Sequence, residues 1–218
     1  IQWETTRRFN FGTELHFLKN RLNVNLNVFK SWTDNLLTYH ELNFITGLEN
    51  NWVNGGSLEN KGYNITVNGH IVATRDWNWE VGASVGHYTN ELTALPDGQN
   101  YVDAEVYGAT IRSQIGQPVN LFYGYKTAPT STGTYVYSTS EEAAADGLYI
   151  LGENGIDRNY FGAGDVKFQD KNGDKKIDPN DDRYVIGDPN PDIYGNIFTS
   201  LSWKRLRLDV NFNYSLGN

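Results

Sequence analysis

The segment from Leu206 to Leu216 alternates apolar and polar side chains without a break. One face is wholly apolar and the other wholly polar: Leu206, Leu208, Val210, Phe212, Tyr214 and Leu216 lie opposite Arg207, Asp209, Asn211, Asn213 and Ser215. A period of two residues indicates a β-strand. Faces this different are typical of a barrel wall that has lipid on one side and water on the other.

The same alternation recurs upstream, in residues 9–17, 22–32, 63–73 and 77–85. In the third segment, 63–73, Ile71 and Ala73 are expected to be the last residues of the apolar face. Short polar stretches at 19–21, 74–76 and 204–205 have the length of hairpin turns, and 41–56 is a longer polar connection. We therefore expect four antiparallel strands in residues 1–92 and two more in 193–218.

Residues 93–192 form a very long connection between these two groups of strands. Short and long connections therefore alternate along the chain, as they do in outer-membrane barrels with tight periplasmic turns and long extracellular loops. We expect 93–192 to be one long extracellular loop. Residues 106–115 and 118–125 could instead supply two more membrane strands, but their broken alternation favours structured loop.

Composition excludes some classes of protein. The chain has 218 residues, a formal net charge of −8, 14% aromatic residues and no cysteine. An acidic chain with scattered Lys and Arg does not fit a nucleic-acid partner. No window approaches the roughly 18 to 20 apolar residues of a transmembrane helix, which barrel strands do not need. Residues 1–8 do not resemble a signal peptide, so we expect a piece of a longer precursor.

An acidic loop within the long connection has the spacing of a calcium-binding loop. Its oxygen ligands are expected from Asp170, Asn172, Asp174, the backbone carbonyl of Lys176, Asp178 and Asp181. Two positions depart from the pattern, because Lys175 stands where the loop normally has Gly and Asp181 where it has Glu. The alternative is that these side chains form Asx turns on a solvated loop, without a metal.

Four tyrosines of the long connection, Tyr123, Tyr125, Tyr135 and Tyr137, are weak candidates for ligand contact, because exposed rings could stack on a sugar or grip a peptide. The alternative is that they pack the core of the loop itself. No catalytic triad, metalloprotease motif or phosphate-binding loop occurs in the sequence. We therefore expect no enzyme.

Four stretches resemble one known family. They are WETTRRFNFGTELHFLKNRLNVNLNVFKSWTDNLL at 3–37, GSLENKGYNITV at 56–67, GQPVNLFYGYK at 116–126 and GDVKFQDKNGDKKIDPNDDRYVIGDPNPDIYGN at 164–196. In this order they are similar to the C-terminal barrel portion of SusC/RagA-like TonB-dependent outer-membrane transporters of Bacteroidota. The resemblance implies an all-β fold in which these six strands belong to a larger barrel of about 22 strands. The plug and the rest of the barrel would lie outside this chain.

The resemblance also implies a function and partners. The family imports bulky nutrients, an oligosaccharide or a peptide, across the bacterial outer membrane together with a SusD-like surface lipoprotein, and TonB acts through the N-terminal part. A second interpretation is a secreted or surface β domain that is stabilised by calcium and binds glycans without transport. A third is another outer-membrane barrel, such as a siderophore receptor. A continuous apolar belt about 25 Å tall would favour the transporter.

Overall fold

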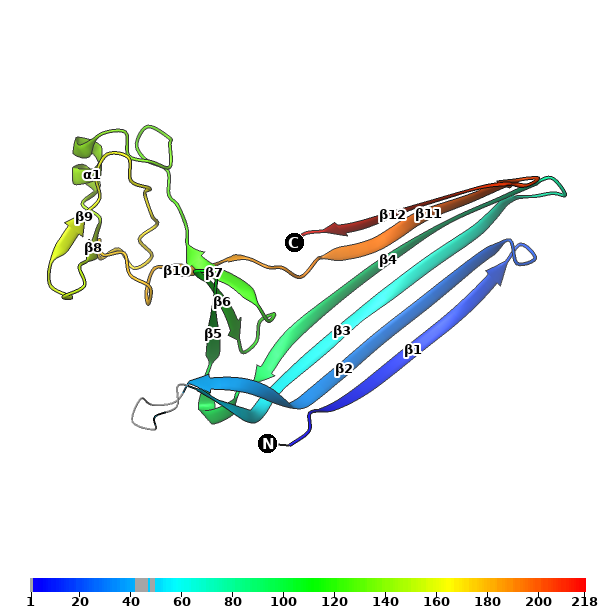
Figure 1. Cartoon of the computed structure of the whole chain (residues 1–218), viewed down its shortest axis with the longest axis horizontal. Helices are drawn as coiled ribbons and strands as arrows, with labels where there is room; N and C mark the ends of the chain where they lie inside the picture. Colours follow the sequence, from blue (N-terminus) through cyan, green and yellow to red (C-terminus); the bar gives the residue numbers. More distant parts are fainter. Residues whose placement is uncertain (1, 42–46, 48–49) are drawn as a thin grey trace. The chain divides into compact units, whose positions relative to one another are not determined.

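The computed structural model describes residues 2–41, 47 and 50–218. Six strands form one antiparallel sheet in the order β1-β2-β3-β4-β11-β12, which is open at both edges (Figure 1). Their bounds are β1 Thr5–Phe17, β2 Leu22–Glu41, β3 Asn50–Ala73, β4 Trp77–Ala94, β11 Ile193–Trp203 and β12 Leu206–Leu216. The all-β, antiparallel fold predicted from the alternation is confirmed. In the part of the chain described, no helix is both long and apolar enough to cross a membrane.

The three short turns of this sheet all lie at the same end (Figure 1). In the first turn Leu18, Lys19 and Asn20 have φ values of 53°, 57° and 66°, a left-handed backbone that Asn tolerates better than most residues. In the second, the Trp77 amide donates to Thr74 Oγ1 at 3.1 Å. These local features close the hairpins where the sequence predicted turns.

The strands differ from the prediction at two places. Residues 50–56, expected in a polar connection at 41–56, belong to β3 instead, while 42–46 and 48–49 lie outside the described residues. A β-bulge between His70 and Val72 pairs Val72 with Trp79 and Ala73 with Asn78. Because a one-residue shift exchanges the faces of a strand, Ala73 does not continue the apolar face as predicted.

The chain divides into two compact units, and the second comprises residues 103–112 and 121–187. Most of a four-stranded sheet, in the order β10-β7-β6-β5, lies in this second unit. Its strands are β5 Tyr101–Val106, β6 Ala109–Gln114, β7 Leu121–Tyr125 and β10 Arg183–Gly187. Residues 106–115 and 118–125 therefore contribute to a separate sheet, not to two more strands of the long one. The remaining elements are η2 Pro96–Gly98, α1 Ser140–Asp146, β8 Tyr149–Leu151 and β9 Arg158–Tyr160.

The second unit has a small core of its own around helix α1. Thr139 caps the helix by accepting the Glu142 amide, and Gly147 ends it with φ 67°, as helix caps commonly do. Tyr137 is 1% exposed and donates its hydroxyl to Asp146 at 2.9 Å. Lys167 pairs with the same carboxylate at 2.5 Å. The cluster ties the helix to Tyr137, just before it, and to the distant segment that contains Lys167.

Candidate functional site

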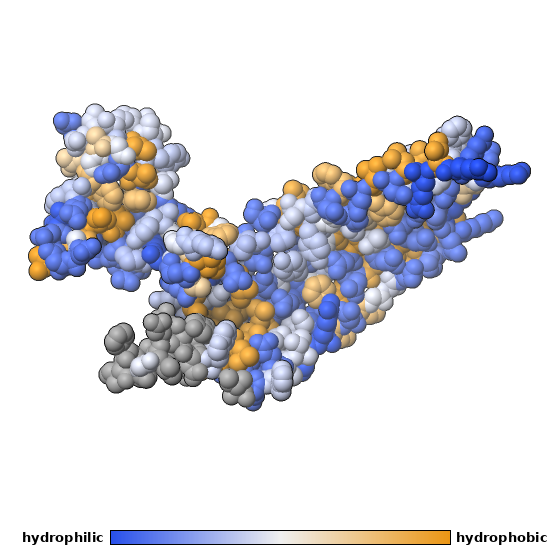
Figure 2. All heavy atoms as spheres, viewed as in Figure 1, coloured by the Kyte–Doolittle hydropathy of each residue, from blue (hydrophilic) through white to orange (hydrophobic). Residues whose placement is uncertain are grey.

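The long sheet has one apolar face that runs across all six strands. The register places apolar residues side by side in one row, Leu15, Val24, Val67, Ala83, Ile197 and Phe212. Large side chains of this face are open to the surroundings, with Phe11 61% and Phe212 65% exposed, and hydrophobic residues run along the β11 and β12 edge of the sheet in Figure 2. A soluble protein rarely exposes so continuous an apolar surface.

Tryptophans lie on this face beside the short turns. The rings of Trp77 in β4 and Trp203 in β11 stack with centroids 5.5 Å apart, and Trp79 donates its indole N–H to Thr199 Oγ1 at 2.8 Å. Amphipathic rings of this kind favour the boundary between lipid and water. The sheet therefore carries an aromatic row where a membrane interface would lie.

The opposite face of the same sheet is polar in the same register. One row consists of Glu14, Asn25, Thr66, Ser84, Asn196 and Asn213. Its side chains form hydrogen bonds across strands, since Ser84 donates to Asn196 and the Tyr194 hydroxyl donates to Asn64 at 3.0 Å. This face is suited to contact with water or a polar ligand.

Three aromatic rings on the polar face lie directly on glycines of the neighbouring strand. A Cβ added to Gly62, Gly82 or Gly86 would lie 2.8, 2.5 or 2.6 Å from the Cζ atom of Phe29, Phe198 or Tyr194, respectively. Each glycine and its ring are cross-strand or near cross-strand neighbours. The absence of a side chain lets the rings lie flat on the sheet, so they take little space on the polar side. These pairs join residues of different strands, so they cannot be recognised without the register.

The segment 188–196, DPNPDIYGN, joins the long connection to β11 through many polar contacts. Asn90, buried at the end of β4, donates to Asn190 Oδ1 at 2.8 Å and accepts the Val119 amide at 2.8 Å. Asp188 accepts both the backbone and the side-chain N–H of Asn190. The segment thus fixes the point at which the chain re-enters the long sheet.

The predicted calcium loop is folded around its own side chains. Asp170 accepts the amides of Gly173 and Lys175 at 2.7 and 2.8 Å, and Asn172 accepts the Asp174 amide at 3.0 Å. Asp174 accepts the Lys176 amide at 2.8 Å. The bonds of Asn172 and Asp174, each to the amide two residues on, are Asx turns, as in the metal-free alternative for this loop.

The second half of the loop is held by an ion pair and a buried carboxylate. Lys176 pairs with Asp178, and this contact holds the pKa of Asp178 below its usual range and raises the pKa of Lys176. Asp178 also accepts the Asp181 amide at 3.0 Å. Asp182 is 0% exposed and accepts the amides of Lys171 and Asp178, both at 2.9 Å. Asp182 was not among the expected ligands, because it stands just after the last position of the calcium-loop pattern.

Within the described ranges, no three His, Cys, Asp or Glu residues lie close enough together to hold a metal ion. A loop of this kind would also use amide and backbone carbonyl oxygens, which such a grouping does not count. Calcium binding by Asp170, Asn172, Asp174, Lys176, Asp178 and Asp181 therefore stays a prediction.

The four candidate tyrosines lie in different surroundings. Tyr137 belongs to the buried core, which does not fit the predicted ligand contact. Tyr123 is half-buried beneath the Arg112 guanidinium, 3.6 Å from its ring centroid, and Tyr125 packs on Phe168 with centroids 5.4 Å apart. Tyr135 is 56% exposed, so it is the candidate that offers most of its ring to a ligand.

Curated TonB-dependent receptors match this chain over its whole length. Receptors P39 and P26 of Formosa agariphila are 27% and 30% identical to it, and SusC of Bacteroides thetaiotaomicron is 25% identical. The chain belongs to the SusC/RagA-like TonB-dependent receptors. It spans about a fifth of the length of these relatives, 20–22%. No family model matches the chain.

Solved structures of the same family agree with the fold. The RagAB peptide transporter matches the whole chain with a TM-score of 0.71 at 24% identity, and the chain covers 22% of it. The RagAB peptide importer in its open-open state matches with a TM-score of 0.70 at 25% identity, and this chain covers 21% of it. SusC/RagA-like receptors are outer-membrane β-barrel proteins, so the open sheet corresponds to a part of such a barrel.

Proposed function

We propose that this chain forms part of the wall of a TonB-dependent transporter that imports a bulky nutrient across the outer membrane. The observation that carries the proposal is the two-faced sheet, which is apolar on one side and polar on the other in one register over six strands. Lipid would cover the apolar face, and the polar face would line the water-filled interior. TonB-dependent receptors match this chain over its whole length, which supports a transporter wall over a glycan-binding surface domain.

Strand length and connection length support a defined orientation in the membrane. A tilted barrel strand crosses the bilayer with about 9 to 11 residues. The strands β11 and β12 have 11 residues each, whereas β3 has 24 and would extend beyond the lipid. The three short turns would lie on the periplasmic side and the long connection 93–192 on the extracellular side.

The nutrient and the partners are proposed from the relatives. RagAB is described as a peptide transporter, which supports a peptide as the imported nutrient, and an oligosaccharide is the other candidate. A SusD-like lipoprotein would capture the nutrient outside, and TonB would act through a part of the protein beyond these residues. The wall would contribute the polar surface along which the nutrient passes, with no chemical step.

A pair of neighbouring substitutions tests the membrane wall. Ile197→Arg places a charge on the apolar face near the middle of the sheet, and Asn196→Arg places the same charge on the polar face. In the complete transporter we expect the first to lower the free energy of unfolding from bilayers by about 2 to 4 kcal/mol and the second by much less. Folded protein is measured by its heat-dependent mobility on gels. Equal losses in the two variants would contradict the wall.

We also propose that the loop 170–181 binds Ca²⁺ with a dissociation constant of roughly 10⁻⁴ to 10⁻³ M, as in extracellular calcium modules. The oxygen-rich spacing supports the site, and the neighbouring lysines would keep the affinity low. Calorimetric titration of the complete protein should show binding that is lost in the variant Asp170→Asn with Asp174→Asn. The matched control is Asp157→Asn with Asp165→Asn. If the wild-type protein shows no heat of binding when calcium is added to millimolar concentration, the site is rejected.

A further inference from the structure

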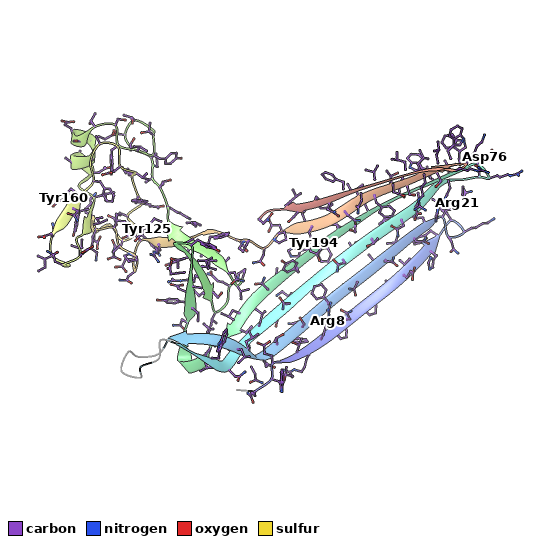
Figure 3. All side chains as sticks on the ribbon, viewed as in Figure 1. Arg8, Arg21, Asp76, Tyr125, Tyr160 and Tyr194 are labelled. Atoms are coloured by element: carbon purple, nitrogen blue, oxygen red, sulfur yellow. The ribbon has the colours of Figure 1, made fainter. Side chains whose placement is uncertain are left out.

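Basic side chains gather at the end of the long sheet that carries the short turns. The turns 18–21, 74–76 and 204–205 contain Lys19, Arg21, Arg75, Lys204 and Arg205, all of them exposed, and a single carboxylate, Asp76. Figure 3 shows Arg21 and Asp76 at this end, and strongly hydrophilic side chains project from it in Figure 2. We call this group of five residues the basic rim.

The basic rim has only one carboxylate within its own turns, Asp76. Across the described residues, none of its five side chains forms an ion pair with a carboxylate. The charge of the turns stays strongly positive, because they contain five basic side chains and one carboxylate. The neighbouring turns are held together, since the Lys204 amide donates to the Asp76 carbonyl at 2.9 Å. The bond keeps Arg75, Lys204 and Arg205 on adjoining turns, and basic side chains grouped in this way suit phosphate groups.

An apolar hollow adjoins the basic rim on the lipid-facing side of the sheet. Its volume is about 230 Å³, and it is lined by Trp77, Leu201, Trp203, Leu206, Arg207 and Leu208. The Lys204 ammonium lies 5.4 Å from the ring of Trp203, so a cation stands at the border of the hollow. Hydrocarbon fits this lining, while a small hydrated anion gains nothing from it.

We propose that the turn end of the sheet binds an anionic phospholipid. Lys204 and Arg205, with Arg75 from the neighbouring turn, hold the phosphate of the headgroup, and one acyl chain lies in the hollow against Trp77 and Trp203. Basic side chains beside an apolar surface attract anionic headgroups in this way. The inference rests on the proposed position of the sheet in a membrane and adds a lipid preference at its periplasmic edge.

The preference is measured on the complete transporter in neutral detergent. Phosphatidylglycerol or phosphatidylcholine is added, and the lipid molecules retained per protein are counted by native mass spectrometry. The wild type is expected to retain phosphatidylglycerol more tightly. The double variant Lys204→Asn with Arg205→Gln should bind phosphatidylglycerol roughly 30-fold more weakly, because each basic side chain near an anionic surface contributes about a factor of five. Asn suits position 204, where φ is 53°.

Two further variants keep the test decisive. Arg158→Gln with Lys175→Gln removes the same charge from the second unit, and we expect it to retain the lipid preference. Trp203→Ser keeps the cations but opens the hollow, and it should weaken the binding of phosphatidylglycerol and phosphatidylcholine alike. Excess inorganic phosphate is expected to leave the lipid bound, because the acyl chain contributes to binding.

Four outcomes would overturn the inference: equal retention of the two lipids, an unchanged preference in the double variant, an equal loss in the control variant, or displacement of the lipid by phosphate. Its failure can be told apart from failure of the proposed function. A transporter that inserts into bilayers without a lipid preference refutes only the lipid site, whereas a protein that does not insert refutes both.

Discussion

Single glycines determine how closely the aromatic rings of the polar face approach the sheet. Phe29, Phe198 and Tyr194 occupy the space in which a Cβ of Gly62, Gly82 or Gly86 would lie. A ring lying flat on a backbone buries apolar area without projecting far into the polar side. These residues therefore keep the polar face shallow, which would leave room for a nutrient in the proposed wall.

Gly82→Ala tests this role. The added methyl group would overlap the Phe198 ring and lie 2.6 Å from Asn68 Oδ1, so we expect a loss of about 1 to 3 kcal/mol in the free energy of unfolding. Thermal unfolding of the complete protein, followed by circular dichroism, measures the loss.

Gly12→Ala is the matched control, because its added Cβ would meet no atom closer than 3.6 Å. Adding Phe198→Leu to Gly82→Ala should restore part of the stability, since the smaller side chain leaves room for the methyl group. The proposed packing is wrong if the two glycine variants unfold at the same temperature.

Among the elements, helix α1 depends on one carboxylate that joins two distant segments. Asp146 accepts the Tyr137 hydroxyl and pairs with Lys167. The contact with Lys167 holds the pKa of Asp146 below its usual range, and burial raises the pKa of Tyr137. Because the folded unit favours the ionised carboxylate, it gains stability from Asp146 at neutral pH. A carboxyl group whose pKa is lowered by folding stabilises the folded state at pH values above its pKa in the unfolded chain. This stabilisation is lost as the pH falls through its pKa in the folded chain.

We therefore expect the segment around α1 to open more easily as pH falls below about 4, the ordinary pKa of an aspartate. Hydrogen exchange of residues 137–147 in the complete protein measures this opening. The variant Asp146→Asn should exchange faster at neutral pH and should show a flatter dependence on acid pH than the wild type.

Substitution of the exposed Glu153 by Gln is the control for this experiment, and we expect it to follow the wild type. If the wild type and Asp146→Asn exchange with the same pH dependence, the ion pair with Lys167 does not stabilise the segment.

At the scale of the whole molecule, the long sheet is explained by its two faces. A six-stranded open sheet with large exposed apolar side chains and two unpaired edges is not suited to water. Membership of the SusC/RagA-like receptors accounts for such a sheet, because these receptors are outer-membrane β-barrel proteins. In the proposed barrel wall, lipid would cover the apolar face and neighbouring strands would pair with β1 and β12. In the proposed position, the basic rim and the tryptophans would mark one boundary of the lipid layer.

Short-range patterns in the sequence are enough to assign the strands of the long sheet, most of their faces and the short turns. Alternation and turn residues act between near neighbours in the chain, so 9–17, 22–32 and 206–216 could be assigned before the register was known. The bulge at His70 and the extension of β3 to Asn50 could not, because they depend on how one strand pairs with the next.

Which polar and aromatic residues come together depends on how the strands and loops pack in three dimensions. The residues of the long connection show no sustained period, so nothing local separated the buried Tyr137 from the exposed Tyr135, or marked Asp182 as the carboxylate that holds the acidic loop. The rings over glycine and the contacts of Asn90 with Asn190 join residues far apart in the chain. Such contacts arise from register and packing, which short-range patterns do not contain.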